Sequence, residues 1–295
     1  MRILITGATG FIGNNLMEYF ESKKNIIFGI SRSKTNKKIK NISLDDKTKL
    51  NNYFKKNKFD VVIHLGSTLN DDNPKTIFDE NISSLITLLE CCRINKIKKF
   101  IFASSHIVYG DTNYLPIDEI HHTNPKNNYG IMKLINENIC KMYSMNYNLE
   151  ISILRISSVY GKGQSEKLII PTLVRNYLLS KELNIHKYKN GFQSMDLIHV
   201  DDVCQAIEST CKLKNKFDIF NVATGNSITA MEIAKIFLKI DKMSKIKIKK
   251  INQTTNHFFY DISKATKKLK FKPKIKVTEK MIKSWLDDST ISKKS

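Results

Sequence analysis

Arginine is scarce in this sequence. Only five of the 49 basic residues are arginines, so lysine supplies nearly all of the positive charge behind a formal net charge of +21. A nucleic-acid-binding surface needs clustered basic residues together with aromatic side chains for stacking. The lysines are scattered instead, with denser stretches at residues 34–40 and 245–250 and no aromatic pattern beside them. We therefore expect solvated lysine faces and no nucleic-acid partner, although the positive field should attract anionic nucleotides.

Long apolar runs and cysteine pairs are missing as well. No apolar run reaches the roughly 18 residues of a membrane-spanning helix, and a core strand begins at once, which leaves no room for a signal peptide. The cysteines are odd in number and lack C-x-x-C spacing, which argues against a disulfide framework or a structural zinc site. They are Cys91, Cys92, Cys140, Cys204 and Cys211. We expect buried reduced thiols, no metal site, no membrane contact and a cytoplasmic protein.

The chain begins with a strand, a glycine-rich turn and a helix. Residues 2–6 read as a buried strand, and a helical pattern follows the turn as far as Phe20. Gly7 permits the tight turn, Gly10 lets backbone N–H groups approach a pyrophosphate, and Gly13 lets helix and strand pack closely. The helix N-terminus then stabilises the phosphate charge. This GxxGxxG variant of the usual GxGxxG fingerprint predicts a dinucleotide site formed by Gly7, Thr9, Gly10, Phe11, Ile12 and Gly13.

A second strand, residues 25–30, ends at Ser31, Arg32 and Ser33. In NAD-binding sites of this kind, a carboxylate near this point binds the ribose hydroxyls of the adenosine. Serine and arginine suit a 2′-phosphate better, because a guanidinium forms charge-assisted hydrogen bonds with phosphate. We therefore favour NADP over NAD as the cofactor, with Arg32 as a ligand. The alternative is a solvated arginine in a basic loop.

Strands and helices alternate further along the chain. Residues 60–67 and 99–105 read as buried parallel strands, and residues 81–92 between them have helical periodicity. The alternation predicts an α/β fold of Rossmann type, a doubly wound parallel sheet with ligands at the carboxyl ends of its strands. Ser105 lies at such an end, and so does the loop that leads to Tyr129.

The length of the chain allows a sizeable core, and we expect three segments. The first is a Rossmann dinucleotide-binding domain over residues 1–165. The second, residues 166–286, is mainly a smaller α+β substrate-binding region whose chain crosses back to the sheet. Residues 287–295 form a polar tail.

Tyr129 and Lys133 stand four residues apart, so on a helix they lie on the same face, one turn from each other. An ammonium near a phenol favours the phenolate and should lower the tyrosine pKa from its usual value of about 10. Such a pair is an acid/base suited to interconverting an alcohol and a ketone. Taken alone, this spacing is common enough to arise by chance.

The surrounding segments indicate that the pair is not a chance occurrence, because together they resemble the extended short-chain dehydrogenase/reductase family. Members of this family are NAD(P)-dependent epimerases, dehydratases and reductases that mostly act on nucleotide-linked sugars. The matching segments follow one another over nearly the whole chain, at residues 7–13, 62–67, 104–110, 129–133, 154–161, 196–202, 220–225 and 261–273.

The resemblance implies roles for single residues. Ser105 resembles the hydroxyl that hydrogen-bonds the reacting sugar oxygen, Tyr129 the acid/base, and Lys133 the residue that lowers its pKa and holds the nicotinamide ribose. Further cofactor-pocket positions are Leu65, Gly66, Ser67 and Asn81. In the implied reaction, a hydride moves between nicotinamide and a sugar carbon while the tyrosine moves the proton. The resemblance also implies a homodimer that packs the helices at residues 81–92 and 129–145.

The chain departs from the family pattern around the substrate. His106 and Ile107 follow Ser105, where family 4,6-dehydratases have an acidic pair, so a dehydratase is not expected. Ser158 stands where many members have an asparagine that contacts the sugar nucleotide, and Met195 where many have an arginine for the nucleotide phosphates. The candidate substrate contacts are therefore His106, Ser158 and Met195, with Lys187 and Lys189 as replacements for the missing charge.

These observations favour an NADPH-dependent reductase acting at C4 of a 4-keto nucleotide sugar, with Tyr129 as acid/base. The alternative is an NAD-dependent nucleotide-sugar 4-epimerase that oxidises and then re-reduces C4 with the same residues. A third reading, from another class, is a non-catalytic dinucleotide- or RNA-binding protein on this fold. Cofactor use separates the first two, and the effect of Tyr129→Phe separates both from the third.

Overall fold

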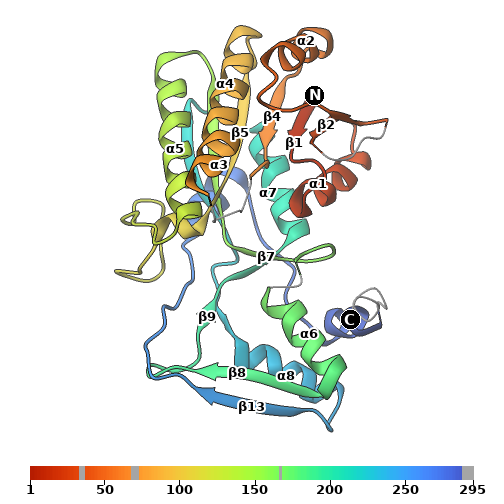
Figure 1. Ribbon diagram of the computed structural model, residues 1–295, viewed down its shortest axis with the longest axis vertical. Helices are drawn as coiled ribbons and strands as arrows, with labels where there is room; N and C mark the ends of the chain where they lie inside the picture. Colours follow the sequence, from red (N-terminus) through yellow and green to blue (C-terminus); the bar gives the residue numbers. More distant parts are fainter. Residues whose placement is uncertain (33–36, 68–72, 166–167, 288–295) are drawn as a thin grey trace.

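The computed structural model describes residues 1–32, 37–67, 73–165 and 168–287. The main feature of these residues is a parallel sheet of seven strands in the order β11-β6-β5-β4-β1-β2-β3. Figure 1 labels β1, β2, β4 and β5 of this sheet. The strands are β1 (Arg2–Thr6), β2 (Ile26–Ser31), β3 (Ile39–Asn41), β4 (Val61–His64), β5 (Lys99–Ser105), β6 (Glu150–Ile156) and β11 (Phe217–Val222).

The strands in the middle of the sheet are apolar runs buried on both faces. Every residue of β4 and β5 is buried, as expected for parallel strands that helices cover on both sides. The strand order reverses at β1, because β2 and β3 lie on one side of it and β4 and β5 on the other. In such sheets, ligands bind outside the carboxyl ends of the strands at this reversal. The predicted doubly wound α/β fold is confirmed.

Helices of the described residues cover both faces of the sheet. They are α1 (Phe11–Glu21), α7 (Val200–Lys212) and α9 (Ser263–Leu269) on one face, and α2 (Lys47–Asn57), α4 (Ser84–Ile94) and α5 (Asn128–Asn146) on the other. Each set contributes to its own buried apolar cluster, and α4 and α5 pack side by side (Figure 1). Since α7, α9 and β11 follow residue 165, the second half of the chain completes the sheet and its cover.

A smaller group of elements lies below the sheet in Figure 1. It contains α6 (Ile169–Ser180), α8 (Ala230–Ile240), α10 (Glu279–Asp287) and the parallel pair of β8 (Glu182–Lys187) and β13 (Lys245–Lys250). These elements share a third apolar cluster, in which the rings of Tyr177 and Phe237 are 5.5 Å apart. This group is the smaller α+β region expected from the sequence. The domain boundaries at residues 165 and 286 stay predictions.

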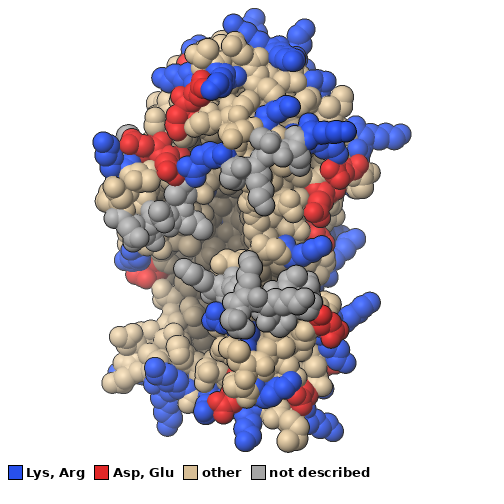
Figure 2. Space-filling model, turned by 45° about the vertical axis from the view of Figure 1, so that its right-hand side comes forward, with Lys and Arg blue, Asp and Glu red and all other residues tan. Residues whose placement is uncertain are grey.

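The remaining strands of the described residues form two short pairs. They are β7 (Ser158–Tyr160) with β10 (Leu197–His199), and β9 (Ser194–Met195) with β12 (Ile228–Thr229). Figure 1 shows β7 and β9, one strand of each pair, between the sheet and this lower group. Figure 2 shows a hollow between the two parts of the molecule, with basic side chains spread over the visible face.

The five cysteines are free and buried, which confirms the prediction of reduced thiols. Among the described residues, no helix combines the length and the apolar character that crossing a membrane requires. Apart from Asp287, which ends α10, the predicted polar tail lies outside the described residues.

Candidate active site

The turn between β1 and α1 depends on its glycines. Gly7 has a φ of +68°, and a Cβ at this position would lie 2.7 Å from the backbone nitrogen of Gly66, two residues after the end of β4. A Cβ on Gly13 would lie 2.1 Å from the carbonyl oxygen of Gly7. In the described residues, no side chain caps the start of α1 at Gly10, and the first turn of the helix carries no acid. Its free N–H groups and dipole therefore suit an anion such as a pyrophosphate.

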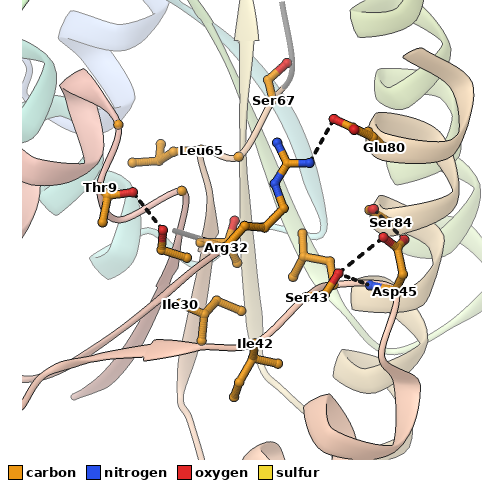
Figure 3. A pocket seen from close by; sticks show the side chains of 16 residues that line it. Thr9, Ile30, Arg32, Ile42, Ser43, Asp45, Leu65, Ser67, Glu80 and Ser84 are labelled. Atoms are coloured by element: carbon orange, nitrogen blue, oxygen red, sulfur yellow. Dashed lines mark hydrogen bonds and ion pairs between the residues drawn. The ribbon is translucent and has the colours of Figure 1, made fainter. Parts of the chain in front are cut away.

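A pocket of about 310 Å³ opens beside this turn (Figure 3). Its volume is within the range of small-molecule sites. Seven of the predicted cofactor residues line it, namely Gly7, Thr9, Gly10, Arg32, Leu65, Gly66 and Ser67. Phe11, Ile12 and Gly13 follow directly at the start of α1. The glycine turn, the uncapped helix and the pocket together fit a dinucleotide.

Two carboxylates stand at the side of this pocket that faces Arg32. The Arg32 guanidinium reaches across the pocket to Glu80 and forms an ion pair of 2.9 Å (Figure 3). Asp45 accepts a hydrogen bond of 2.8 Å from the Ser84 hydroxyl at the start of α4. Arg32 was predicted to face a 2′-phosphate. In the structure its charge is offset by the Glu80 carboxylate, which comes from a different part of the chain.

Asn81 links the pocket to α5. It lies in a π-helical turn (Phe78–Ser83) between the short helix α3 (Pro74–Ile77) and α4. Its side-chain oxygen accepts a hydrogen bond of 3.1 Å from Ser67, and its backbone oxygen accepts one of 3.4 Å from Asn136 of α5. A π-turn displaces a carbonyl from the regular helical pattern, and such turns are frequent at functional sites. The predicted cofactor position is therefore connected to the helix that carries Tyr129.

Tyr129 and Lys133 lie on one face of α5, next to β5. The Lys133 ammonium is 5.5 Å from the centre of the Tyr129 ring and donates a hydrogen bond of 2.8 Å to the Ala103 carbonyl. β5 ends two residues later at Ser105, which is 8% exposed and accepts a hydrogen bond of 3.3 Å from the Ile107 N–H. Ser105 thus keeps its own proton for donation at the carboxyl end of the sheet, where ligands bind.

The predicted lowering of the Tyr129 pKa is wrong for this structure. Burial raises the pKa of Tyr129 to about 12, because the phenolate loses hydration. Burial also lowers the pKa of Lys133 to about 8. The ammonium faces the Ala103 carbonyl and the Phe102 ring, 5.0 Å away, besides the face of the Tyr129 ring. It is therefore not aimed at the phenolic oxygen, and desolvation dominates.

A buried ion pair holds α5 against the sheet, one helical turn beyond Lys133. Arg155 of β6 and Glu137 of α5 approach to 2.7 Å, with side chains only 5% and 4% exposed. The Ser104 hydroxyl donates a further hydrogen bond of 2.5 Å to Glu137. Since Glu137 lies one turn beyond Lys133, its charge opposes the fall in the Lys133 pKa that burial causes.

The candidate substrate residues are not all brought together. His106 and Ser158 meet, with 3.4 Å between the ring Nε2 and the hydroxyl oxygen. Met195 lies on β9, partly buried against the apolar cluster of the lower group. Lys187 and Lys189 are exposed at the end of β8 and in the turn that follows.

The family model described as "NAD dependent epimerase/dehydratase family" matches residues 3–223. The chain belongs to the NAD-dependent epimerase/dehydratase family. As a member it is an NAD(P)-dependent enzyme of the sugar epimerase, dehydratase and reductase type. This confirms both the resemblance to extended short-chain dehydrogenases/reductases and the expectation of an enzyme, against the non-catalytic reading.

Relatives and solved structures of the epimerase/dehydratase family match the chain over nearly its full length. It is 31% identical to a putative UDP-glucose 4-epimerase of Methanocaldococcus jannaschii, over 97% of this chain and 99% of the relative. A UDP-glucuronic acid 4-epimerase of Bacillus cereus, solved with UDP-glucuronic acid and NAD, superposes with a TM-score of 0.83 at 24% identity and 97% and 98% coverage. RMD of Pseudomonas aeruginosa, solved with NADPH, gives 0.84 at 20% identity and 97% and 98% coverage. The two structures confirm the fold.

Four site residues were missed in the sequence. Glu80 directly precedes the recognised Asn81, and Asp45 follows the short strand β3. Glu137 lies eight residues after Tyr129, and this spacing on a helix could have revealed it. Tyr260, whose hydroxyl lies 2.7 Å from His106, directly precedes the recognised segment at residues 261–273 and carried no signal of its own.

Proposed function

We propose that the chain is an NAD-dependent 4-epimerase of a nucleotide-linked sugar, with Tyr129 as its acid/base. The observation that carries this choice is the ion pair between Arg32 and Glu80 beside the glycine turn. A 2′-phosphate at Arg32 would come close to the Glu80 carboxylate, and like charges repel. The ribose hydroxyls of NAD can instead donate hydrogen bonds to a carboxylate. The similarity to a putative UDP-glucose 4-epimerase supports the same choice.

The proposed reaction uses the residues at the carboxyl end of β5. A bound nicotinamide dinucleotide supplies the acceptor and later the donor of hydride. Tyr129 takes the proton of the sugar C4 hydroxyl as hydride leaves C4, which oxidises that carbon to a ketone. Ser105 donates a hydrogen bond to the same oxygen and stabilises the charge that develops there. When the opposite face of the ketone is reduced, Tyr129 returns the proton, and the reaction involves no net oxidation.

Lys133 has a specific task in this proposal. The Tyr129 phenolate is costly to form, since burial raises the pKa of the phenol to about 12. The Lys133 ammonium is not aimed at the phenolic oxygen and does not offset that cost in the free protein, so its proposed task is to hold the nicotinamide ribose when the dinucleotide is bound. Its pKa of about 8 keeps the ammonium largely charged at neutral pH.

An NADPH-dependent 4-keto sugar reductase is the second candidate, and one observation favours it. The Arg32 side chain is 62% exposed, and an exposed ion pair contributes at most about 1 kcal/mol. Breaking this ion pair so that the guanidinium turns to a 2′-phosphate therefore costs little. A 4,6-dehydratase has less support, because His106 and Ile107 supply no carboxylic acid after Ser105.

Cofactor content and turnover of one substrate test the proposal. Purified protein is denatured to identify any cofactor it releases, and intact protein is incubated with UDP-galactose without added NADPH. We expect NAD and the formation of UDP-glucose. Tyr129→Phe should retain NAD, and its rate of epimerisation should be about 10²- to 10⁴-fold lower. Tyr53→Phe, the control in helix α2, should have the wild-type rate. Release of NADP, with NADPH-dependent reduction of a 4-keto nucleotide sugar and no epimerisation, would overturn the proposal.

We also propose a homodimer that packs α4 and α5 against a second copy. Apolar side chains are exposed on both helices, namely Ile86 and Ile94 on α4 and Ile131, Ile135 and Met142 on α5. Exposed apolar patches of this kind mark protein contacts. Sedimentation analysis checks the proposal, and Ile135→Glu should shift the protein to a monomer.

A further inference from the structure

Three segments far apart in the sequence meet around the ring of His106. The hydroxyl of Tyr260 lies 2.7 Å from His106 Nδ1, although 154 residues separate them. The hydroxyl of Ser158 lies 3.4 Å from Nε2 on the other side of the ring. The rings of Phe258 and Tyr260 pack in T-shaped arrangements with the imidazole, with ring centres 6.1 and 5.7 Å away. Both ring nitrogens therefore have a hydroxyl neighbour, at clearly different distances.

The burial of Tyr260 determines which imidazole nitrogen carries the proton. Tyr260 is 2% exposed, and burial holds the pKa of its phenol well above the usual range. Within the described residues, its hydroxyl has no hydrogen-bond partner other than His106. A buried hydroxyl hydrogen without an acceptor is costly, so Tyr260 donates to Nδ1. A neutral imidazole that accepts at Nδ1 carries its proton on Nε2.

The Nε2–H group of His106 forms only a weak hydrogen bond within the protein. At 3.4 Å, its contact with Ser158 is at the long limit of a hydrogen bond. His106 and Ser158 are both partly exposed, in contrast to Tyr260. Burial lowers the pKa of His106 to about 4, so the ring is neutral near pH 7. The pair thus offers a neutral N–H and a hydroxyl to a ligand, without a charge.

The backbone around Tyr260 is fixed by contacts on two sides. The Ile117 N–H donates to the Phe259 carbonyl at 3.0 Å, and the Asp261 N–H donates to the Ile117 carbonyl at 2.8 Å. The Tyr260 ring stacks on Tyr109, with centres 6.1 Å apart. His106 itself begins the helical turn that Ser105 caps. Tyr260 is therefore held rigidly where it contacts His106. His106 is the residue directly after Ser105, the candidate catalytic serine.

We propose that His106 binds a sugar oxygen next to the reacting carbon through Nε2–H, and that Tyr260 positions it by holding the imidazole in this tautomer. The proposal rests on the proposed function, because it takes Ser105 as the residue that binds the reacting oxygen. Tyr260 is a positioning residue and His106 a substrate-binding residue. Ser158 shares the Nε2–H in the free protein and yields it to the sugar.

Nitrogen-15 NMR of the imidazole tests the tautomer directly and needs no turnover. In the wild type, the His106 signals, assigned with His106→Gln, should be those of a neutral ring protonated at Nε2. In Tyr260→Phe they should move towards a mixture of tautomers. Tyr109→Phe is the matched control, because it removes another buried phenol hydroxyl, which donates to Asn221 at 2.6 Å. It should reduce stability and leave the His106 signals in place. Wild-type signals of an Nδ1-protonated ring, or no change in Tyr260→Phe, would overturn the proposal.

Kinetics with UDP-galactose test the contact with the sugar. Tyr260→Phe and His106→Gln should each raise KM about 3- to 10-fold, the effect of one neutral hydrogen bond, with a much smaller change in kcat and an unchanged affinity for NAD. The double variant should cost no more than His106→Gln alone, because Tyr260 acts through His106. Additive losses, or a fall in kcat with constant KM, would contradict the proposal.

Failure of the proposed function would look different. If the wild type turns over no UDP-galactose, epimerisation of this sugar nucleotide is ruled out, while the tautomer measurement still decides the role of Tyr260. In that case, binding of UDP-galactose to the NAD-loaded protein, followed by calorimetry, replaces KM. A loss of affinity in Tyr260→Phe would support the contact, and an unchanged affinity would refute it.

Discussion

The ion pair between Arg32 and Glu80 gives a sharp test of cofactor choice. The two side chains approach to 2.9 Å across the pocket (Figure 3). Glu80→Gln removes the negative charge but keeps the length and a hydrogen-bond acceptor. Arg32 then no longer forms this ion pair, and a 2′-phosphate no longer meets the Glu80 carboxylate. We therefore expect Glu80→Gln to bind NADP more tightly than the wild type does.

The size of this effect follows from the exposure of the pair. Two unit charges about 4 Å apart interact by about 1 kcal/mol in water and about 4 kcal/mol at an effective dielectric constant near 20. Since the Arg32 and Glu80 side chains are 62% and 30% exposed, the lower part of this range applies. Removing the repulsion should be worth about 1–2 kcal/mol, or about a 5- to 30-fold rise in the NADP-to-NAD affinity ratio. Affinity for NAD should fall only slightly, because glutamine still accepts a hydrogen bond.

Titration calorimetry with NAD and NADP measures the ratio directly. Glu90→Gln is the matched control, because Glu90 lies in α4 outside this pocket and pairs with Arg93 at 2.7 Å. It makes the same change in net charge and should leave the ratio unchanged. If Glu80→Gln leaves the ratio at the wild-type value, or moves it towards NAD, the reasoning from the ion pair is refuted.

Three further predictions concern the helix that carries Tyr129 and the glycine turn. Arg155→Met leaves the buried Glu137 charge without its partner and should lower the free energy of unfolding by about 3–5 kcal/mol. Urea unfolding measures this loss. The double variant Arg155→Met/Glu137→Met should be more stable than Arg155→Met alone. Burial lowers the pKa of Lys133 from 10.5 to about 8, so between these pH values the unfolded chain binds more protons than the folded one. The unfolding free energy of the wild type should therefore rise with pH relative to Lys133→Met across this window, and a constant difference would count against the buried ammonium. Gly13→Ala places a Cβ 2.1 Å from the Gly7 carbonyl oxygen; it should lower the melting temperature and weaken dinucleotide binding, and unchanged binding would contradict the proposed role of the turn.

The sheet could be predicted well because its signals are local. β1 and β5 have the bounds expected from their apolar runs, Arg2–Thr6 and Lys99–Ser105. Parallel strands buried on both faces are continuous apolar segments between turn residues, so their ends are marked in the sequence. The helix expected at residues 81–92 was less accurate, since a π-helical turn precedes α4. A π-helical turn differs from an α-helix in which backbone carbonyl each N–H group binds, and hydrophobic periodicity carries no information about this.

The contacts of the candidate site were harder to predict because they join distant parts of the chain. Nothing near Arg32 indicates that Glu80, on a different element, would pair with it. The contact between His106 and Tyr260 spans 154 residues, and the fold alone brings them together. The spacing of Tyr129 and Lys133 correctly predicted a shared helix face. It did not predict the pKa of Tyr129, because burial, which dominates that pKa, depends on the packed structure.

Proton transfer by Tyr129 is the central claim, and a single-turnover experiment tests it most directly. NAD-loaded protein is mixed rapidly with UDP-glucose, and the absorbance of reduced nicotinamide is followed. In the wild type we predict a burst of reduced nicotinamide. In Tyr129→Phe, with NAD and UDP-glucose still bound, we predict a rate about 10²- to 10⁴-fold lower. A burst in Tyr129→Phe as fast as that of the wild type would contradict the account.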